Sequence, residues 1–196
     1  MLNANRLSEA LRKLVYDNKE QFKTELASVT EDLDLDVVKQ GPLMIYTRNR
    51  RNAIYYAITA YLSIKADKIL EFASISGQNL ISQYFLTEET RDKELWDSIY
   101  YDDITFIYLS QYDYTNDFLE NLIMSLIDFR TQMKKATIVL FDIQSEPATN
   151  TATMAKKLYT YFKSNGYNTI DITKKAIAQP GITSKPVRVV KKGPLL

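Results

Sequence analysis

The sequence predicts an α/β domain of three layers, in which helices cover both faces of a five-stranded, mostly parallel sheet. Short apolar runs of strand length alternate five times with segments whose apolar residues recur at helical spacing. Parallel neighbours need crossover connections, which the helical segments supply. With 196 residues, 45% of them hydrophobic, the chain is long enough to bury a continuous core. We expect this domain at residues 41–173, between a helical extension at 1–40 and a tail at 174–196.

The extension begins with an amphipathic pattern. Apolar residues at helical spacing predict one long helix over residues 4–26, which packs either on its own domain or on a partner. The acidic stretch at 31–36 is interpreted as a turn or linker. The apolar stripe consists of Leu7, Leu11, Leu14, Val15 and Phe22.

The first half of the domain opens with a buried strand at residues 43–46, an unbroken apolar run introduced by a Gly-Pro pair. An apolar stripe at helical spacing predicts a helix at 51–65. A second apolar run predicts a strand at 69–73, followed by a helix at 77–85. A charged helical segment at 88–99 completes this half.

The second half repeats the alternation and contains the most regular helical pattern of the chain. That pattern begins after Thr115 or Asn116, either of which can cap a helix, and it closes with Arg130, Lys134 and Lys135 at its positive end. Asn165-Gly166 is a typical stop signal for the last helix. The remaining predicted elements are strands at 104–109, 136–141 and 169–172 and a helix at 153–164.

The composition excludes much of enzyme chemistry. The chain has no Cys and no His, which excludes disulfides, thiolate nucleophiles, zinc sites of the usual ligand set and Ser-His catalysis. Carboxylate, Lys, Tyr and backbone chemistry remain, with carboxylate-bound Mg²⁺ as the ordinary metal option. Only five Gly residues are available for a phosphate-binding loop.

The charge is divided unevenly between body and tail. The tail has six basic residues and no acidic one, which leaves the first 173 residues with 19 basic and 24 acidic residues, a net charge of −5. We interpret the tail as an extended arm that is either solvated or lies along a partner or a phosphate backbone. Its basic residues are Lys174, Lys175, Lys185, Arg188, Lys191 and Lys192.

No apolar run reaches the roughly 18 residues of a membrane span, and no export signal is visible. We therefore expect a cytoplasmic protein without membrane contact.

A ligand of such a sheet binds outside the carboxyl ends of its strands, next to helix N-termini. The loop after the first strand is the position of a phosphate-binding loop. It contains Arg48, Arg50 and Arg51, which are interpreted either as a solvated basic loop or as a contact for phosphate or DNA.

The stretch GPLMIYTRNRRNAIYYAITAYL at 41–62 resembles the strand, P-loop and helix of the AAA+ helicase-loader family, which includes the DnaC/DnaI-like loaders and the IstB-type transposition helpers. The family has G-x-x-x-x-G-K-[ST] in this loop. Both glycines, the phosphate-binding Lys and the Mg²⁺-binding hydroxyl are replaced here. The matched positions are Thr47, Asn52, Ala53 and Ile54.

Two later segments carry the same resemblance. DITFIYLSQYDYTNDFLENLIMSLIDFR at 103–130 resembles the Walker B strand and the helix after it, but the two acidic positions hold Tyr108 and Leu109. KKATIVLFD at 134–142 resembles the sensor strand, with Asp142 at the family's polar position.

The resemblance implies a replication accessory protein of loader type, from a phage or mobile element, whose partner is a replicative helicase or another DNA-processing assembly. Nucleic acid is a second expected partner, through the Arg loop or the tail. The replaced residues predict a pseudo-ATPase that hydrolyses no ATP and needs no cofactor or metal.

Two alternatives stay open. The domain is alternatively a structural scaffold subunit of a larger clamp-loader-like, polymerase or transposition complex. An enzyme with unrelated chemistry is less favoured, because no convergent acid/base pair is visible. A metal site at Asp102, Asp103, Asp113 and Asp117 is conceivable, although the helix dipole alone explains Asp117.

Overall fold

The computed structural model describes residues 19–48, 51–68, 70–110, 113, 116–142 and 155–172, without the side chains of residues 19–25, 52 and 64. The predicted helix before residue 19, Arg50 and the six basic residues of the tail lie outside the described residues. In the part of the chain that is described, no helix is long and apolar enough to cross a membrane. The elements are α2 (Lys19–Asp32), η1 (Leu35–Gln40), β1 (Leu43–Thr47), α3 (Arg51–Ala66), β2 (Phe72–Ser76), α4 (Gly77–Phe85), α5 (Lys93–Tyr101), β3 (Ile104–Leu109), α6 (Asp117–Gln132), β4 (Ala136–Asp142), α7 (Lys156–Ser164) and β5 (Asn168–Asp171).

The five strands form one sheet in the order β2-β3-β4-β1-β5, and every neighbouring pair is parallel. This confirms the predicted α/β class. Two of the three inner strands, β1 and β4, are aligned so that Leu43 pairs with Ile138 and Thr47 with Asp142. Both strands are buried on both faces, which explains their unbroken apolar runs.

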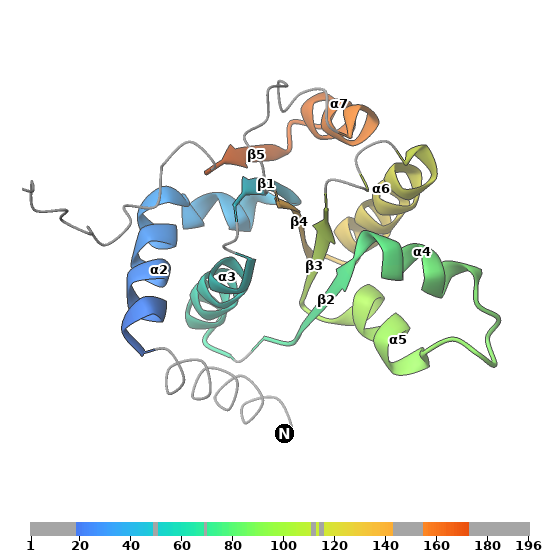
Figure 1. Ribbon diagram of the computed structural model, residues 1–196, viewed down its shortest axis with the longest axis horizontal. Coiled ribbons are helices and arrows are strands. Elements are labelled where there is room, and N and C mark those ends of the chain that lie inside the picture. The colour runs from blue at the N-terminus through green and yellow to red at the C-terminus, as the bar shows by residue number, and fades with distance from the viewer. Residues whose placement is uncertain are drawn as a thin grey trace, which may run out of the picture.

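Helices cover both faces of the sheet (Figure 1). On one face, α2, η1 and α3 pack against Leu43 and Ile45 of β1 and their neighbours. On the other face, helices α4 to α7 pack against Met44 and Tyr46 of the same strand. The alternation along β1 therefore divides the core into the two clusters of a three-layer domain.

The acidic stretch at 31–36 forms the predicted turn only at Leu33 and Asp34, between two helices. Helix α2 continues to Asp32, and the 3-10 helix η1 follows after Asp34, whose side chain accepts a hydrogen bond from the Asp36 N–H. Val29, Leu33 and Val38 are buried in the cluster that contains α3. Burial of these apolar residues, before, within and after the acidic stretch, holds the segment on the domain. The boundaries at residues 40 and 173 stay predictions.

Three element boundaries also differ from the predictions. Strand β2 begins at Phe72 instead of residue 69 and includes the polar Ser74, because it is an edge strand whose exposed positions need no apolar side chain. Helix α5 begins at Lys93 instead of residue 88, since Asp92 is its N-cap. Helix α7 begins at Lys156 instead of residue 153.

The two predicted helix-end signals of the second half are confirmed. The Asn116 side chain caps α6 by accepting a hydrogen bond from the Leu119 N–H at 3.1 Å. After α7, Gly166 has a φ of 68°, the left-handed conformation that favours glycine.

Helix α6 carries two buried charged side chains that tie it to other elements. Arg130 is completely buried and donates hydrogen bonds to the hydroxyl of Thr137 and to four backbone carbonyls, those of Ile99, Tyr100, Asp102 and Ala136. Burial lowers its pKa to about 10. Glu120 accepts a hydrogen bond from the Leu158 N–H at 2.7 Å, and burial raises its pKa. Ala155, the N-cap residue of α7, makes no side-chain hydrogen bond to the helix. Glu120 of the neighbouring helix α6 therefore caps α7 in its place.

Candidate functional site

The chain connections place a switch point at the carboxyl ends of β1 and β4. From β1 the chain crosses through α3 to the edge strand β2, whereas from β4 it crosses through α7 to β5 on the opposite side. Ligands of open α/β sheets bind at such points. Thr47 and Asp142, the last residues of the two strands, pair side by side there.

Polar groups at the end of β1 face a buried environment. Thr47 is completely buried, and its hydroxyl has no hydrogen-bond partner among the described residues. The Nε of Arg48 is also buried and has no hydrogen-bond partner among the described residues. By contrast, Ala53 and Ile54 are core residues on the α3 face of the sheet. The structure therefore places these two predicted loop positions in the hydrophobic core.

Tyr108, Arg51 and Asp142 form one interacting group at this edge. The Tyr108 hydroxyl donates a hydrogen bond to the Asp142 carboxylate at 3.3 Å. The Arg51 guanidinium lies over the Tyr108 ring, 4.5 Å from its centroid. Burial and the Asp142 carboxylate raise the pKa of Tyr108, so its phenol stays neutral. Leu109, the next residue, is buried in the core of the opposite face.

Tyr55 belongs to the same edge, although the sequence pattern did not single it out. Burial raises the pKa of its phenol to about 12, although the nearby Arg51 charge lowers it. Tyr55, Ser74 and Arg51 line a pocket of about 560 Å³ beside the Tyr108 group, together with Ser76 and Asn79. The pocket presents hydroxyl, amide and guanidinium groups, which bind polar or anionic ligands but supply no general base.

The predicted acidic residues do not converge. Asp113 is buried and accepts hydrogen bonds from the N–H and hydroxyl of Ser110 at 2.8 and 2.9 Å. Asp117 pairs with Lys157 at 2.6 Å. Asp102 and Asp103 precede β3 and therefore lie at the opposite, amino-terminal edge of the sheet. Among the described residues, no group of three or more acids is placed to hold a metal ion.

Several solved structures resemble this fold, although no protein-family model and no curated protein sequence matches the chain. A DNA replication initiation factor is 12% identical, with a TM-score of 0.49 over 87% of this chain and 46% of that one. A DnaC helicase loader is 11% identical, with a TM-score of 0.47 over 76% of this chain and 86% of that one. The replication initiator DnaA bound to AMPPCP and single-stranded DNA is 12% identical, with a TM-score of 0.49 over 74% and 44%.

The chain thus spans less than half of the initiation factor and of DnaA. With identities of 11–12% and TM-scores below 0.5, these similarities assign no activity to it.

The two neighbouring aspartates at the amino-terminal edge have opposite pKa shifts. Burial raises the pKa of Asp102 to about 6, and the nearby Glu71 carboxylate adds to this. Asp103 is also partly buried, but hydrogen bonds and charge attraction from Lys135, at 2.9 Å, lower its pKa overall.

Ionisation of Asp102 therefore opposes folding, and we expect Asp102→Asn to stabilise the protein at neutral pH. A raised pKa in the folded state means that stability is lost as the pH rises from about 4 to about 6. Because the side chain is half exposed, we expect a gain of only about 1 kcal/mol at pH 7 and none below pH 4. Urea unfolding at a series of pH values measures it.

Asp103→Asn is the matched control, with the opposite sign. It removes a carboxylate whose pKa is lowered, so it should destabilise at pH 7 and lose this effect as the pH falls. Equal changes in the free energy of unfolding for both variants at pH 7 would contradict the opposite pKa shifts of Asp102 and Asp103.

Proposed function

We propose that this chain is a non-catalytic, AAA+-like accessory protein of DNA replication, similar to a helicase loader, that acts by binding protein and DNA without hydrolysing ATP. The observation that carries the proposal is the Tyr108 group. The resemblance puts the Mg²⁺-holding acid of the family at position 108. An aromatic ring stands there, covered by Arg51 and hydrogen-bonded to Asp142.

Three components that ATP hydrolysis needs are replaced at the carboxyl ends of these strands. Hydrolysis of ATP needs a carboxylate for Mg²⁺, a cation for the β/γ-phosphates and glycines that let the backbone approach the phosphates. Ala53, at the position of the cation, is a buried core residue. The loop at 47–54 contains no glycine. The Arg51 guanidinium is already engaged with the Tyr108 ring.

The expected partners follow from the resemblance and from the charges. A replicative helicase or a related DNA-processing assembly is the protein partner. Arg48, Arg50 and Arg51 or the basic tail would contact nucleic acid, since Arg and Lys supply the salt-dependent part of such binding.

The proposal is tested by gel filtration of the full chain with the hexameric replicative helicase of its native cell. We expect co-elution that is the same without nucleotide and with ATP and Mg²⁺. A Tyr108→Ala variant, which opens the site without supplying a carboxylate, should co-elute equally. Failure to co-elute under either condition would overturn the loader assignment.

Nucleotide binding is tested separately, so that the two parts of the proposal fail independently. A fluorescent ATP analogue should show no Mg²⁺-dependent anisotropy change with the wild-type chain, while a P-loop ATPase in parallel gives the positive signal. Micromolar, Mg²⁺-dependent binding would show that the site is intact.

A further inference from the structure

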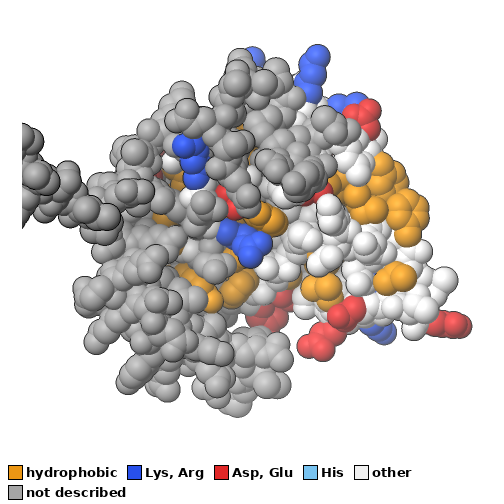
Figure 2. Space-filling model, viewed as in Figure 1, with side chains coloured by type: hydrophobic (Ala, Val, Ile, Leu, Met, Phe, Trp, Pro, Cys, Tyr) orange, Lys and Arg blue, Asp and Glu red, His pale blue; other side chains and the backbone are white. Residues whose placement is uncertain are grey.

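An exposed aromatic cluster lies at the end of α4, beside the start of α6. Phe85 and Phe118 stack, with 5.2 Å between their ring centroids, and Tyr84 packs edge-on against both. All three rings are exposed, Phe85 to 68%. Figure 2 shows hydrophobic side chains gathered over α4 and α6. Contiguous exposed apolar surface of this kind marks interaction sites.

The cluster is held in place and is followed by acidic residues. The Arg91 guanidinium donates hydrogen bonds to the carbonyls of Gln83, Tyr84 and Leu86 at 2.8 to 3.1 Å, which fixes the end of α4. Glu88 and Glu89 come directly after and are exposed. The segment therefore presents apolar side chains on a fixed helix end, followed in the chain by two exposed carboxylates.

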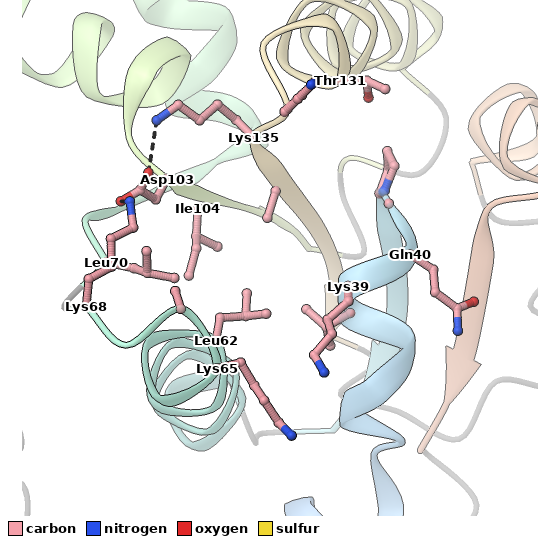
Figure 3. A pocket seen from close by; sticks show the side chains of 16 residues that line it. Lys39, Gln40, Leu62, Lys65, Lys68, Leu70, Asp103, Ile104, Thr131 and Lys135 are labelled. Carbon is pink, nitrogen blue, oxygen red and sulfur yellow. Dashed lines mark hydrogen bonds and ion pairs between the residues drawn. The ribbon is translucent and has the colours of Figure 1, made fainter.

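A groove lined by aliphatic side chains and lysines lies at the amino-terminal ends of the strands, opposite the ends that carry the aromatic cluster. It has a volume of about 720 Å³ and an aliphatic floor that includes Leu62, Leu70 and Ile104 (Figure 3). Of the residues that the structure describes, five lysines and one acid, Asp103, line it. Lys68 and Lys135 both pair with Asp103, at 3.4 and 2.9 Å. The lysines are Lys39, Lys65, Lys68, Lys134 and Lys135.

The lining indicates which ligand fits. Among the described residues, no aromatic ring lines the groove, so nucleic-acid bases would find no stacking platform there. Apolar side chains flanked by carboxylates match an aliphatic floor with a lysine rim. The chain's own tail, with six basic residues and no acid, has the wrong charge for this groove.

We propose that the aromatic cluster of one copy docks into the lysine-rimmed groove of a second copy. The cluster is near the carboxyl ends of the strands, where α6 begins, whereas the groove is at their amino ends, where β3 and β4 begin. The contact joins two different surfaces and is therefore head-to-tail, so each added copy leaves one cluster and one groove open. This inference does not depend on the proposed function.

Sedimentation of the full chain over a concentration series tests the contact. The mass of the wild type should rise above the 22.7 kDa of one chain with concentration, and less so at high salt. A cluster variant, Glu88→Lys/Glu89→Lys, and a groove variant, Lys65→Glu/Lys134→Glu, should each stay monomeric. The groove variant spares the lysines that pair with Asp103. Lys156→Glu/Lys163→Glu on α7 is the matched charge control and should associate like the wild type.

Mixing the two monomeric variants distinguishes this contact from nonspecific charge effects. The groove variant keeps its cluster and the cluster variant keeps its groove, so the mixture should form a dimer and stop there.

A wild-type chain that stays monomeric at all concentrations would overturn the proposal, as would a mixture that does not dimerise. Fluorescence anisotropy with a fluorescein-labelled oligothymidylate tests whether the groove binds the phosphates of single-stranded DNA instead of the carboxylates of a second copy. Loss of its binding in the groove variant, with a monomeric wild type, would assign the groove to nucleic acid instead.

Discussion

Replacing Arg130 by methionine is expected to lower the free energy of unfolding by about 3–5 kcal/mol. Methionine fills similar space but takes the Arg130 donor away from the carbonyls of Tyr100, Asp102 and Ala136. The Ile99 carbonyl keeps the hydrogen bond from the Thr105 hydroxyl. Each buried carbonyl without a partner costs about 1–3 kcal/mol, partly recovered where water enters. Urea unfolding followed by circular dichroism measures the loss.

Arg91→Met is the matched control. This arginine also donates to three carbonyls, but it is half-buried and its acceptors are near solvent. We expect a loss of about 1 kcal/mol or less. A similar loss for both variants would show that burial is not what makes Arg130 important.

Gly77→Ala should destabilise the protein by about 1–3 kcal/mol, although alanine is the better helix former. An added Cβ would lie 2.7 Å from the Leu119 Cδ2 and 2.9 Å from the Leu109 Cδ2. It would also lie 3.1 Å from the Asp113 Cγ, so the carboxylate that holds Ser110 would have to shift. Thermal unfolding of the variant and the wild type measures the effect.

A second substitution separates crowding from any other effect of Gly77→Ala. Leu119→Val removes the atom that approaches most closely, so the double variant should lose less than the sum of the two single losses. Strict additivity would argue against the clash.

The central strands could be predicted from the sequence because burial on both faces requires unbroken apolar runs. The predicted bounds of the strands that became β3 and β4 fall within one residue of the observed bounds. The strand predicted at 69–73 lies too early in the chain, because the observed strand β2 continues through Ser74 and Ser76, which carry no apolar signal. Helix α5 begins later than predicted because the Asp92 side chain caps it, so the charged residues before Asp92 lie outside the helix.

The candidate site was predictable only in part. Strand alternation places Thr47, Tyr108 and Asp142 at the carboxyl ends of neighbouring strands, and the structure confirms that position. The contact of Arg51 with the Tyr108 ring joins residues far apart in the sequence, and no local pattern encodes it. Tyr55 carried no signal, because a buried tyrosine on a helix looks like any other core residue.

The sheet order has a consequence for synthesis. β1 is the first strand to leave the ribosome, yet its neighbours in the sheet are β4 and β5, which are among the last. Until Ala136 has emerged, β1 has two unpaired edges and no ladder to join, while β2 and β3 already pair in chain order. A nascent or truncated chain that ends before β4 therefore exposes an apolar strand to its neighbours on a polysome, and aggregation should concentrate in that window.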